Sequence, residues 1–392
     1  MIKKMMISAF VTSLLITSGC SGYTTTDESS TKELNVGEVT REAEVDHQMT
    51  QYFFPHENDE HEGTWLQWPH NKTYEGTTDA YDPIWIEMTR GLVKGENVHI
   101  IVYDETEKER VQNVLTEQKV DMTKVDFYVF PTDDVWSRDN GPIFAYDEEG
   151  NLVVQNWQFN GWGNKAPYEN DNEIPQKVGT ALDLPVIDID MVMEGGALEL
   201  DGKGTLISTL SCVNNDNRTA NYSLEEIETY LSTYYGVTNF IWLEGVAGMD
   251  ITDNHIDGMI KIVDEHLIIA NDEFDLDPDS LPDGDDAKTL LTATNAMGQP
   301  YEFVFLPETK KPVVEVQGEW MKGSYMNFYV GNAVVLVPNY NDPNDAIAND
   351  ILQGIYVDKE IVGIDVRDLF ADGGMIHCVT QQQPVAKTNQ HQ

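Results

Sequence analysis

The sequence is poor in basic residues and in cysteine. Its 392 residues include only 24 Lys and Arg against 68 Asp and Glu, which gives a formal net charge of -44 at pH 7. Because so acidic a surface repels nucleic acid, we expect no nucleic-acid partner. Three cysteines are too few for a disulfide scaffold. The hydrophobic share of 41% and the eight Trp are nonetheless typical of a globular protein with a sizeable core.

The hydrophobic run near the N-terminus is too short to cross a bilayer. Met5–Ile16 has fewer than the roughly 20 apolar residues that a membrane-spanning helix needs. It follows two lysines and leads through small residues to Cys20, as in secretory signals. The stretch resembles a bacterial lipoprotein signal, which implies export, lipidation of Cys20 and anchoring to the membrane. An ordinary cleaved secretion signal is the alternative.

By its composition, the remainder of the chain divides into a tether, a domain and a short tail. Residues 21–50 are rich in Ser, Thr and Glu with few large apolar side chains, which predicts a flexible tether. We place the catalytic domain at residues 51–384 and a short C-terminal tail at 385–392.

Within this domain, hairpins, helices and strands recur in the same order. Alternating or β-branched strands flank polar turns in four predicted hairpins: 142–145 with 152–159, 197–200 with 205–210, 258–263 with 266–270, and 326–330 with 333–338. Helical patterns followed by short apolar strands lie between them: 223–235 then 239–243, 287–297 then 301–306, and 345–356 then 361–366. Ser223 and Glu226 form a capping box at the start of one of these helices.

The repeating unit predicts an α/β fold of a particular kind. A fifth unit is completed if residues 375–381 pair with residues 64–68, which joins the two ends of the domain. Five similar units favour a single-domain, pseudo-symmetric, five-bladed α/β propeller with a site near its axis. An open mixed α/β sheet is the alternative.

Unusual polar residues fall at nearly the same corner of successive units. Asp139 precedes the first hairpin, Glu194 the second, and His255 and Asp257 the third, while Cys378 lies in the fifth unit. In a closed ring these corners meet, so we expect the five side chains to share one pocket. Asn327 occupies the same corner of the fourth unit.

One thiol, one imidazole and three carboxylates suit a cationic substrate. Acyl transfer would suffer from extra carboxylates, because they repel a developing oxyanion. A planar guanidinium instead offers paired N–H donors to carboxylates, and its charge favours the thiolate of a cysteine. The set therefore predicts attack by a thiolate on a guanidinium carbon, with the imidazole moving protons. No cofactor is needed, and no second His or Cys cluster completes a zinc site around His255-Ile-Asp257.

Six motifs carry a resemblance to a known family. They are Trp136-Ser-Arg-Asp139-Asn-Gly-Pro142, Phe159-Asn-Gly-Trp-Gly163, Glu194-Gly-Gly196, Asp201-Gly-Lys-Gly-Thr205, His255-Ile-Asp257 and Ile376-His-Cys378-Val-Thr-Gln-Gln382. In this order they resemble the agmatine deiminase and bacterial, Porphyromonas-type peptidyl-arginine deiminase family, over roughly residues 52–384. That resemblance implies the five-bladed pentein fold of the guanidine-modifying enzymes.

The resemblance also implies a role for each matching residue. Cys378 would be the nucleophile and His255 the proton shuttle. Asp139 and Asp257 would clamp the guanidinium, while Glu194 would orient His255 and bind substrate. Trp136 would cover the flat face of the substrate. For Asn327, its corner position in the fourth unit, rather than the resemblance, leads us to expect that it lines the pocket. Two residues depart from the family's Gly-Gly-Gly-Asn-x-His-Cys stretch: Asp372 and Met375.

Other conspicuous residues are interpreted as structural. We expect His377 to point away from the site by strand alternation, Cys212 to be a small buried residue, and Trp65 and Trp162 to belong to the core. A disulfide between Cys212 and Cys378 is the alternative for the two remaining thiols. The acids of residues 275–286 are spaced like a calcium loop but lack its glycine, so we favour a solvated acidic loop.

Three functions remain open from the sequence. The first is hydrolysis of agmatine to N-carbamoylputrescine and ammonia through a covalent thiouronium intermediate. The second is deimination of arginine within exported or host peptides, which a surface location would favour. The third is a lipoprotein that binds guanidine or polyamine ligands without turnover. A cysteine peptidase is a more distant alternative.

Overall fold

Five small sheets of the same pattern make up most of the protein. The computed structural model describes residues 51–387 except residues 77, 272–284 and 317–318. These residues belong to one contact unit, Met49–Gln392. Cys20, the predicted tether and most of the acidic loop lie outside the described residues. Among the described helices, none combines the length and the hydropathy that crossing a bilayer requires.

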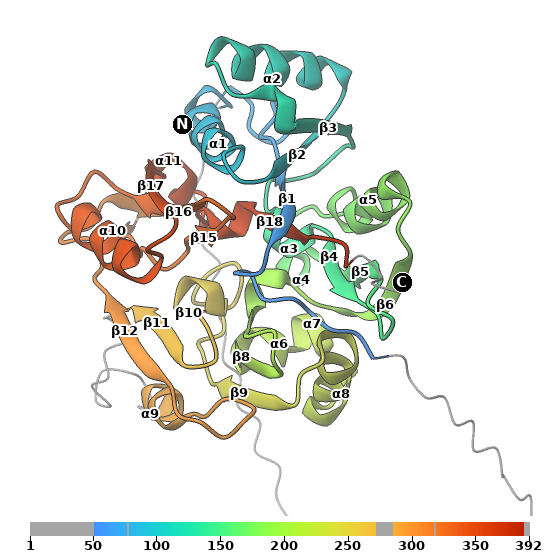
Figure 1. Cartoon of the computed structure of the whole chain (residues 1–392), viewed down its shortest axis with the longest axis vertical. Coiled ribbons are helices and arrows are strands. Elements are labelled where there is room, and N and C mark those ends of the chain that lie inside the picture. Colours follow the sequence, from blue (N-terminus) through green and yellow to red (C-terminus); the bar gives the residue numbers. More distant parts are fainter. Residues whose placement is uncertain (1–50, 77, 272–284, 317–318, 388–392) are drawn as a thin grey trace, which may run out of the picture. The chain divides into compact units, whose positions relative to one another are not determined.

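In each sheet the second strand is antiparallel to the first and parallel to the third. The strands are β4 (Ile143–Tyr146), β5 (Leu152–Gln158) and β6 (Val186–Val192); β7 (Leu198–Leu200), β8 (Thr205–Thr209) and β9 (Asn239–Leu243); β10 (Ile260–Ile262), β11 (Leu267–Asn271) and β12 (Glu302–Leu306); and β15 (Tyr329–Val330), β16 (Val334–Asn339) and β17 (Glu360–Asp365). The remaining sheet has four strands, β18 (Gln381–Pro384), β1 (His61–Gln67), β2 (Asn97–Val102) and β3 (Val125–Val129). Figure 1 shows the sheets following one another in chain order.

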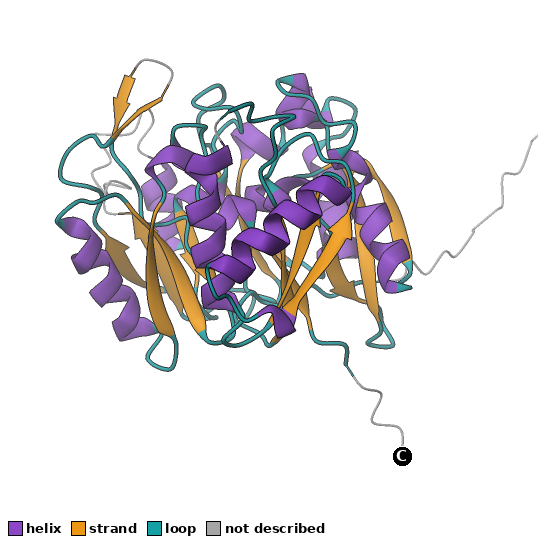
Figure 2. Ribbon diagram, turned by 90° about the horizontal axis from the view of Figure 1, so that it is seen from above, coloured by secondary structure: helices purple, strands orange, loops and turns teal. Residues whose placement is uncertain are grey.

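Helices make the crossovers that parallel strand pairs need. They are α1 (Thr78–Leu92), α2 (Glu105–Glu117), α5 (Ile174–Leu182), α8 (Leu224–Tyr235), α9 (Asp285–Thr292) and α10 (Asn344–Ile355). In Figure 2 the long helices lie over the strands, and a separate hairpin of β13 (Val314–Val316) and β14 (Glu319–Met321) projects from one side. The capping box predicted for α8 is confirmed: Ser223 Oγ accepts from the Glu226 backbone, and Glu226 returns the bond.

The four predicted hairpins are confirmed, with strand ends that differ by a few residues. The fifth pairing is only partly right. β1 pairs with β18, but Trp65 lies opposite Gln381, so the paired strand begins at Gln381 rather than at Met375. Residues 377–379 form instead a single 3-10 turn, η5 (His377–Val379). Cys378 therefore precedes the strand, and strand alternation does not govern where its neighbours point.

A short helical turn stands before the first strand of four sheets. These turns are α3 (Ser137–Asn140) before β4, η3 (Gly195–Ala197) before β7, η4 (Ile256–Gly258) before β10, and η5 before β18. α3 contacts both η3 and η5, and η3 contacts η4. The corners that the repeat pattern marked are therefore brought together by these turns. The remaining short helices are α4 (Gly161–Asn164), α6 (Leu210–Val213), α7 (Asp216–Thr219) and α11 (Arg367–Phe370), with η1 (Met122–Lys124) and η2 (Asp171–Glu173).

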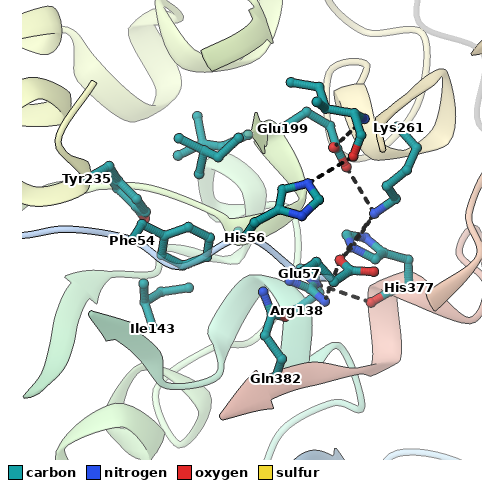
Figure 3. Close-up of a pocket in the computed structure, with 14 residues that line it drawn as sticks. Phe54, His56, Glu57, Arg138, Ile143, Glu199, Tyr235, Lys261, His377 and Gln382 are labelled. Carbon is teal, nitrogen blue, oxygen red and sulfur yellow. Dashed lines mark hydrogen bonds and ion pairs between the residues drawn. The ribbon is translucent and has the colours of Figure 1, made fainter. Parts of the chain in front are cut away.

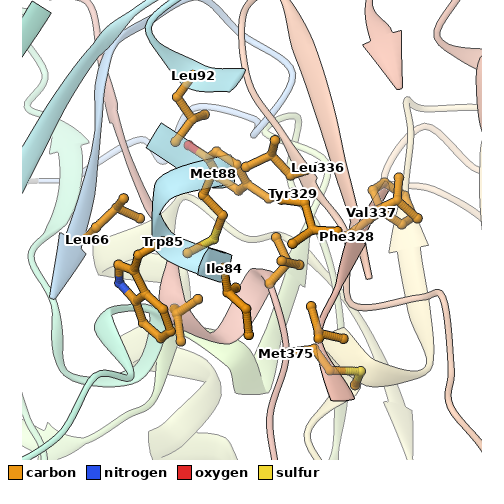
Figure 4. Packing of buried hydrophobic residues seen from close by; sticks show 14 of the residues in the cluster. Leu66, Ile84, Trp85, Met88, Leu92, Phe328, Tyr329, Leu336, Val337 and Met375 are labelled. Carbon is orange, nitrogen blue, oxygen red and sulfur yellow. The ribbon is translucent and has the colours of Figure 1, made fainter. Parts of the chain in front are cut away.

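The largest hydrophobic core lies between α1 and the sheet of β15–β17. Trp85 and Met88 of α1 pack in the same cluster as Leu336 of β16, and all three side chains are fully buried. Figure 4 shows that Met375, close to the nucleophile predicted from the sequence, belongs to this cluster too. The loop that carries Cys378 is thus fixed against the main core.

Candidate functional site

Cys378 lies where two cavities meet. One cavity of about 180 Å³ is lined by Trp136, Asp139, Trp162 and Cys378 among others. A second cavity of about 440 Å³ is lined by His255, Asp257, Asn327 and Cys378 among others. The structure therefore brings the predicted nucleophile next to five of the six other candidate residues. Glu194, the sixth, lies behind His255.

The thiol of Cys378 is half-buried and faces acids. Its Sγ is 3.8 Å from Asp257 Oδ2 and 3.4 Å from Asn327 Oδ1. Burial and the negative charges of Asp257 and Asp139 raise the pKa of this thiol well above its usual range. Without a ligand, the site therefore holds a protonated thiol. A cation placed between the acids would remove the charge that keeps it protonated.

His255 is buried between two carboxylates. Its Nε2 is 2.9 Å from Glu194 Oε2, and its Nδ1 is 3.7 Å from Asp139 Oδ1. Burial opposes a positive charge on the ring, but Asp139 and Cys212 raise the pKa of the imidazole well above its usual range. Since Nε2 is held by Glu194, Nδ1 is the nitrogen that can exchange a proton with a ligand.

The pKa values of the two aspartates that line the cavities are shifted in opposite directions. Burial raises the pKa of Asp139, with the neighbouring acids adding to the rise and His255 opposing it. Burial acts on Asp257 in the same direction, but the hydrogen bond and charge of His377 hold its pKa below the usual range. Asp139 accepts hydrogen bonds from Gly196 N at 3.0 Å and Trp162 Nε1 at 2.9 Å.

The Glu194-Gly-Gly196 motif allows a close approach that a side chain would prevent. A Cβ at position 196 would lie 2.7 Å from His255 Nδ1 and 2.8 Å from Asp139 Oδ1. Gly374 has the same importance on the other side of the site, because its Cβ would come within 2.3 Å of the Trp136 ring. These two glycines let the catalytic candidates meet.

Behind Glu194 lies an ion-pair chain that the sequence did not indicate. Arg218 Nε donates to Glu194 Oε1 at 2.8 Å, and its Nη1 lies 2.5 Å from Asp253 Oδ2. Lys165 Nζ donates to the same Asp253 oxygen at 2.6 Å. Although burial disfavours its charge, His255 and Arg218 hold the pKa of Glu194 below the usual range. These bonds hold the Glu194 carboxylate in place against His255. Contact between Glu194 and the substrate stays a prediction.

Among the described residues, one group of side chains could hold a metal ion. It consists of Glu194, Cys212 and His255, whose donor atoms lie within 4.8 Å of one another. Cys212 is buried as predicted, and its Sγ lies 3.5 Å from Glu194 Oε2. However, the Arg218 guanidinium donates to both oxygens of Glu194, and its charge opposes a cation there. Glu194 is therefore better suited to orienting His255 than to binding a metal ion.

Three interpretations from the sequence need correction. Cys212 and Cys378 are both free thiols, so the disulfide alternative is wrong. Trp162 is buried as expected, but it also donates to Asp139 and lines a cavity. Its positive φ of 55°, in a turn with two glycines of positive φ, aims the indole at the site.

His377 does not point away from the site, as strand alternation predicted: its Nδ1 is 2.8 Å from Asp257 Oδ2. Trp65 is a core residue, fully buried beside Tyr128.

Carboxylates supply negative charge on the walls of both cavities. Asp134 and Asp372 line the smaller one together with Asp139, and Tyr74 and Tyr81 donate to them. Burial raises the pKa of Asp134 to about 6. No Lys or Arg is among the described residues that line either cavity. The site as a whole is therefore suited to a ligand with positive charge and not to one with a free carboxylate.

Comparison with known proteins gives consistent matches along the domain. The model of the family described as Porphyromonas-type peptidyl-arginine deiminase matches residues 53–384. A relative from Streptomyces coelicolor named "Putative agmatine deiminase" is 33% identical over 340 residues, which cover 83% of this chain and 96% of that protein. The solved structure of an Enterococcus faecalis agmatine deiminase catalysing its reaction is 26% identical, with a TM-score of 0.75 over 85% of this chain and 96% of that one.

A second solved structure is of an agmatine deiminase from C. jejuni with substrate bound, in which a cysteine is replaced by serine. It is 26% identical to this chain, with a TM-score of 0.74, and the match covers 86% of this chain and 98% of that one.

Proposed function

The chain belongs to the Porphyromonas-type peptidyl-arginine deiminase family, hydrolases that act on the C–N bonds of guanidino groups, and we propose that its substrate is agmatine. The products are N-carbamoylputrescine and ammonia. The observation that carries this choice is the lining of the two cavities around Cys378, which has several carboxylates and no described Lys or Arg. Agmatine has a cation at each end, whereas free arginine carries a carboxylate that these acids repel.

The first half of the reaction forms a covalent intermediate. The guanidinium binds between Asp139 and Asp257, and its charge favours loss of the Cys378 proton to solvent. The thiolate attacks the guanidinium carbon and forms a C–S bond. His255 gives the proton on Nδ1 to a terminal nitrogen, the C–N bond breaks, and ammonia leaves. A thiouronium on Cys378 and a neutral His255 remain.

The second half returns the enzyme to its starting state. Neutral His255 takes a proton from water at Nδ1, and the hydroxide adds to the thiouronium carbon. Collapse of the tetrahedral centre breaks the C–S bond, and the proton of its hydroxyl group passes to the departing sulfur, which releases the neutral ureido product and restores the Cys378 thiol. Glu194 keeps the ring in place throughout, because its own carboxylate is fixed by Arg218. Trp136 and Trp162 supply the flat walls of the cavity.

One assay tests the substrate and the nucleophile together. The domain of residues 51–392 is incubated with agmatine, free arginine or an arginine-containing peptide, and ammonia and ureido product are measured. We expect turnover of agmatine, and loss of about 10⁴-fold or more in kcat for Cys378→Ser. The Cys378→Ser variant should still bind agmatine in calorimetry. Turnover of peptide alone would assign peptidyl-arginine deimination instead, and binding without turnover would assign a guanidine-binding protein.

The arrangement of the sheets is the second part of the proposal. The five sheets close into a five-bladed pseudo-symmetric α/β propeller of the pentein type, with the site near its axis. The same strand pattern in every sheet and the pairing of β1 with β18 support this. A crystal structure in which the five sheets share no common axis would rule it out.

The third part of the proposal concerns the cellular location of the protein. The protein is exported and anchored to the bacterial membrane through lipid on Cys20, on the support of the lipoprotein-like signal in the sequence. In a bacterial host, the wild-type chain should incorporate a labelled fatty acid and sediment with membranes. Cys20→Ala should do neither. Equal membrane association of the two chains would contradict the anchor.

A further inference from the structure

Below the thiol lies a cluster of buried charges that the reaction scheme does not use. Figure 3 shows Glu57, Arg138, Lys261 and His377 pointing toward one another from separate parts of the chain. Lys261 Nζ lies 3.1 Å from Glu57 Oε2 and 3.0 Å from Glu199 Oε1. All of these side chains are buried. Charges this deep need partners on every side, so the cluster has a specific arrangement rather than a loose one.

His377 links this cluster to the substrate-facing Asp257. Its Nδ1 is 2.8 Å from Asp257 Oδ2, and its Nε2 is 2.8 Å from Glu57 Oε2. Despite burial, Lys261 and His377 hold the pKa of Glu57 well below its usual range. Asp257 is likewise ionised, with its pKa lowered. Since a carboxylate can only accept, Nδ1 of His377 donates to Asp257, while Nε2 lies between the Glu57 carboxylate and Lys261 Nζ at 3.1 Å.

The other buried charges of the cluster pair with one another. The carboxylates of Glu57 and Glu199 are balanced by Lys261 and Arg138, whose Nη2 is 3.6 Å from Glu57 Oε2. Asp257 is a further buried carboxylate in contact with the cluster, and the donor that reaches it from the cluster is Nδ1 of His377. Loss of this bond would leave the buried Asp257 carboxylate with one donor fewer.

The same contacts orient Asp257 and Cys378 relative to each other. Asn327 Nδ2 donates to Asp257 Oδ2 at 3.1 Å, while Asn327 Oδ1 accepts from His377 N at 2.9 Å and Cys378 N at 3.3 Å. Within the described part of the chain, the hydrogen bonds to Asp257 fall on Oδ2. Oδ1 is therefore the oxygen that remains for a ligand in the adjoining cavity.

We propose that His377 and Glu57 are positioning residues of the deimination site: the His377 ring, held from behind by Glu57, donates to Asp257 and keeps that carboxylate turned toward the substrate guanidinium. This inference rests on the proposed function for its substrate. Neither residue touches the substrate. His377 acts through Asp257, and Glu57 acts through His377.

Two substitutions and a matched control test the kinetic consequence. Glu57→Gln keeps the size of the side chain but removes its charge, and His377→Asn removes the ring that bridges Glu57 and Asp257. Each should raise KM for agmatine about 10- to 100-fold, with a smaller fall in kcat, because a charge-assisted hydrogen bond to the clamp is weakened. His99 is also buried between two carboxylates, Glu62 and Asp126, but lies away from the site. His99→Asn should lower Tm and leave KM unchanged.

A measurement on the wild-type protein does not depend on any variant folding. Nitrogen NMR of ¹⁵N-histidine-labelled protein should show that Nδ1 of His377, which faces Asp257, carries a proton at neutral pH. An unprotonated Nδ1 would overturn the inference. So would wild-type KM in both variants while the wild-type enzyme converts agmatine. If the wild-type enzyme releases no ammonia from agmatine, the proposed function fails, and the NMR result still decides the state of the ring.

Discussion

The acids around Cys378 have opposite effects on its reactivity and on turnover. Because the charges of Asp257 and Asp139 raise the pKa of the thiol, removing either charge should increase the thiolate fraction. The same removal weakens the grip on a guanidinium. The two carboxylates therefore suppress the thiol until a cation arrives.

We therefore predict that removing one of these charges changes the alkylation rate of Cys378 and the turnover of agmatine in opposite directions. Asp257→Asn should speed the alkylation of Cys378 by iodoacetamide near neutral pH, by about tenfold for each pKa unit that the thiol falls. The same variant should lower kcat/KM for agmatine by about 10- to 100-fold. In the wild type, where the thiol pKa is raised, alkylation should keep rising above pH 9. Slower alkylation together with slower turnover would show that the substitution had disrupted the site as a whole.

Asp372 is the residue through which the second cation of agmatine can be tested. It lines the cavity that contains Cys378, and Tyr81 donates to its carboxylate. Asp372→Asn should raise KM for agmatine about 3- to 10-fold, since an exposed charge pair contributes on the order of 1 kcal/mol. With butylguanidine, which lacks the terminal ammonium, KM should stay the same. An equal rise for both substrates would remove Asp372 from the recognition of the tail.

Several site residues were predictable from the sequence, and others were not, for a physical reason. Asp139, His255 and Cys378 lie at the same corner of a repeating unit, so their proximity follows from the repeat. Arg218 and Glu57 have no such position, because they act across sheets through contacts that only the folded chain creates. His377 was misplaced because a helical turn replaces the extended strand that the alternation argument assumed.

At the scale of elements, the start of α8 offers a measurable contribution. Ser223 and Glu226 satisfy each other's backbone N–H groups, and Gly236 ends the helix in the left-handed conformation with a φ of 73°. Ser223→Ala should lower the free energy of unfolding by about 1 kcal/mol, because the backbone N–H of Glu226 loses its acceptor. Denaturant unfolding checks this value. Deimination should be unchanged, since α8 does not line either cavity.

Strand and helix positions were predicted more successfully than the segments between them. β9 has the predicted boundaries, and α10 differs from its prediction by one residue at each end, because apolar periodicity is strong in both. The short turns α3, η3, η4 and η5 were not predicted as helical. Each is only three or four residues long, which is too short for a periodic pattern, and tertiary contacts fix its conformation. The site is built on these turns.

At the scale of the whole molecule, the dominant feature is the charge of -44. Repulsion among so many carboxylates opposes the compact state, and salt screens it. Raising NaCl from about 0.1 M to about 1 M shortens the Debye length from about 10 Å to about 3 Å and should raise Tm. Scanning calorimetry at a series of salt concentrations measures the effect. A Tm that falls with salt would mean that attractive ion pairs, such as those around Arg218, outweigh the repulsion.

The pairing of β1 with β18 places the two ends of the domain beside each other, with His61 opposite Pro384. A short linker could therefore join these ends, and new termini could be opened at an exposed hairpin turn such as Asp147–Gly150. Such a circular permutant would carry Cys378 in the middle of its sequence and still present the thiol to the same partners. The place of the nucleophile along the sequence is thus not essential to the site, while its neighbours in space are.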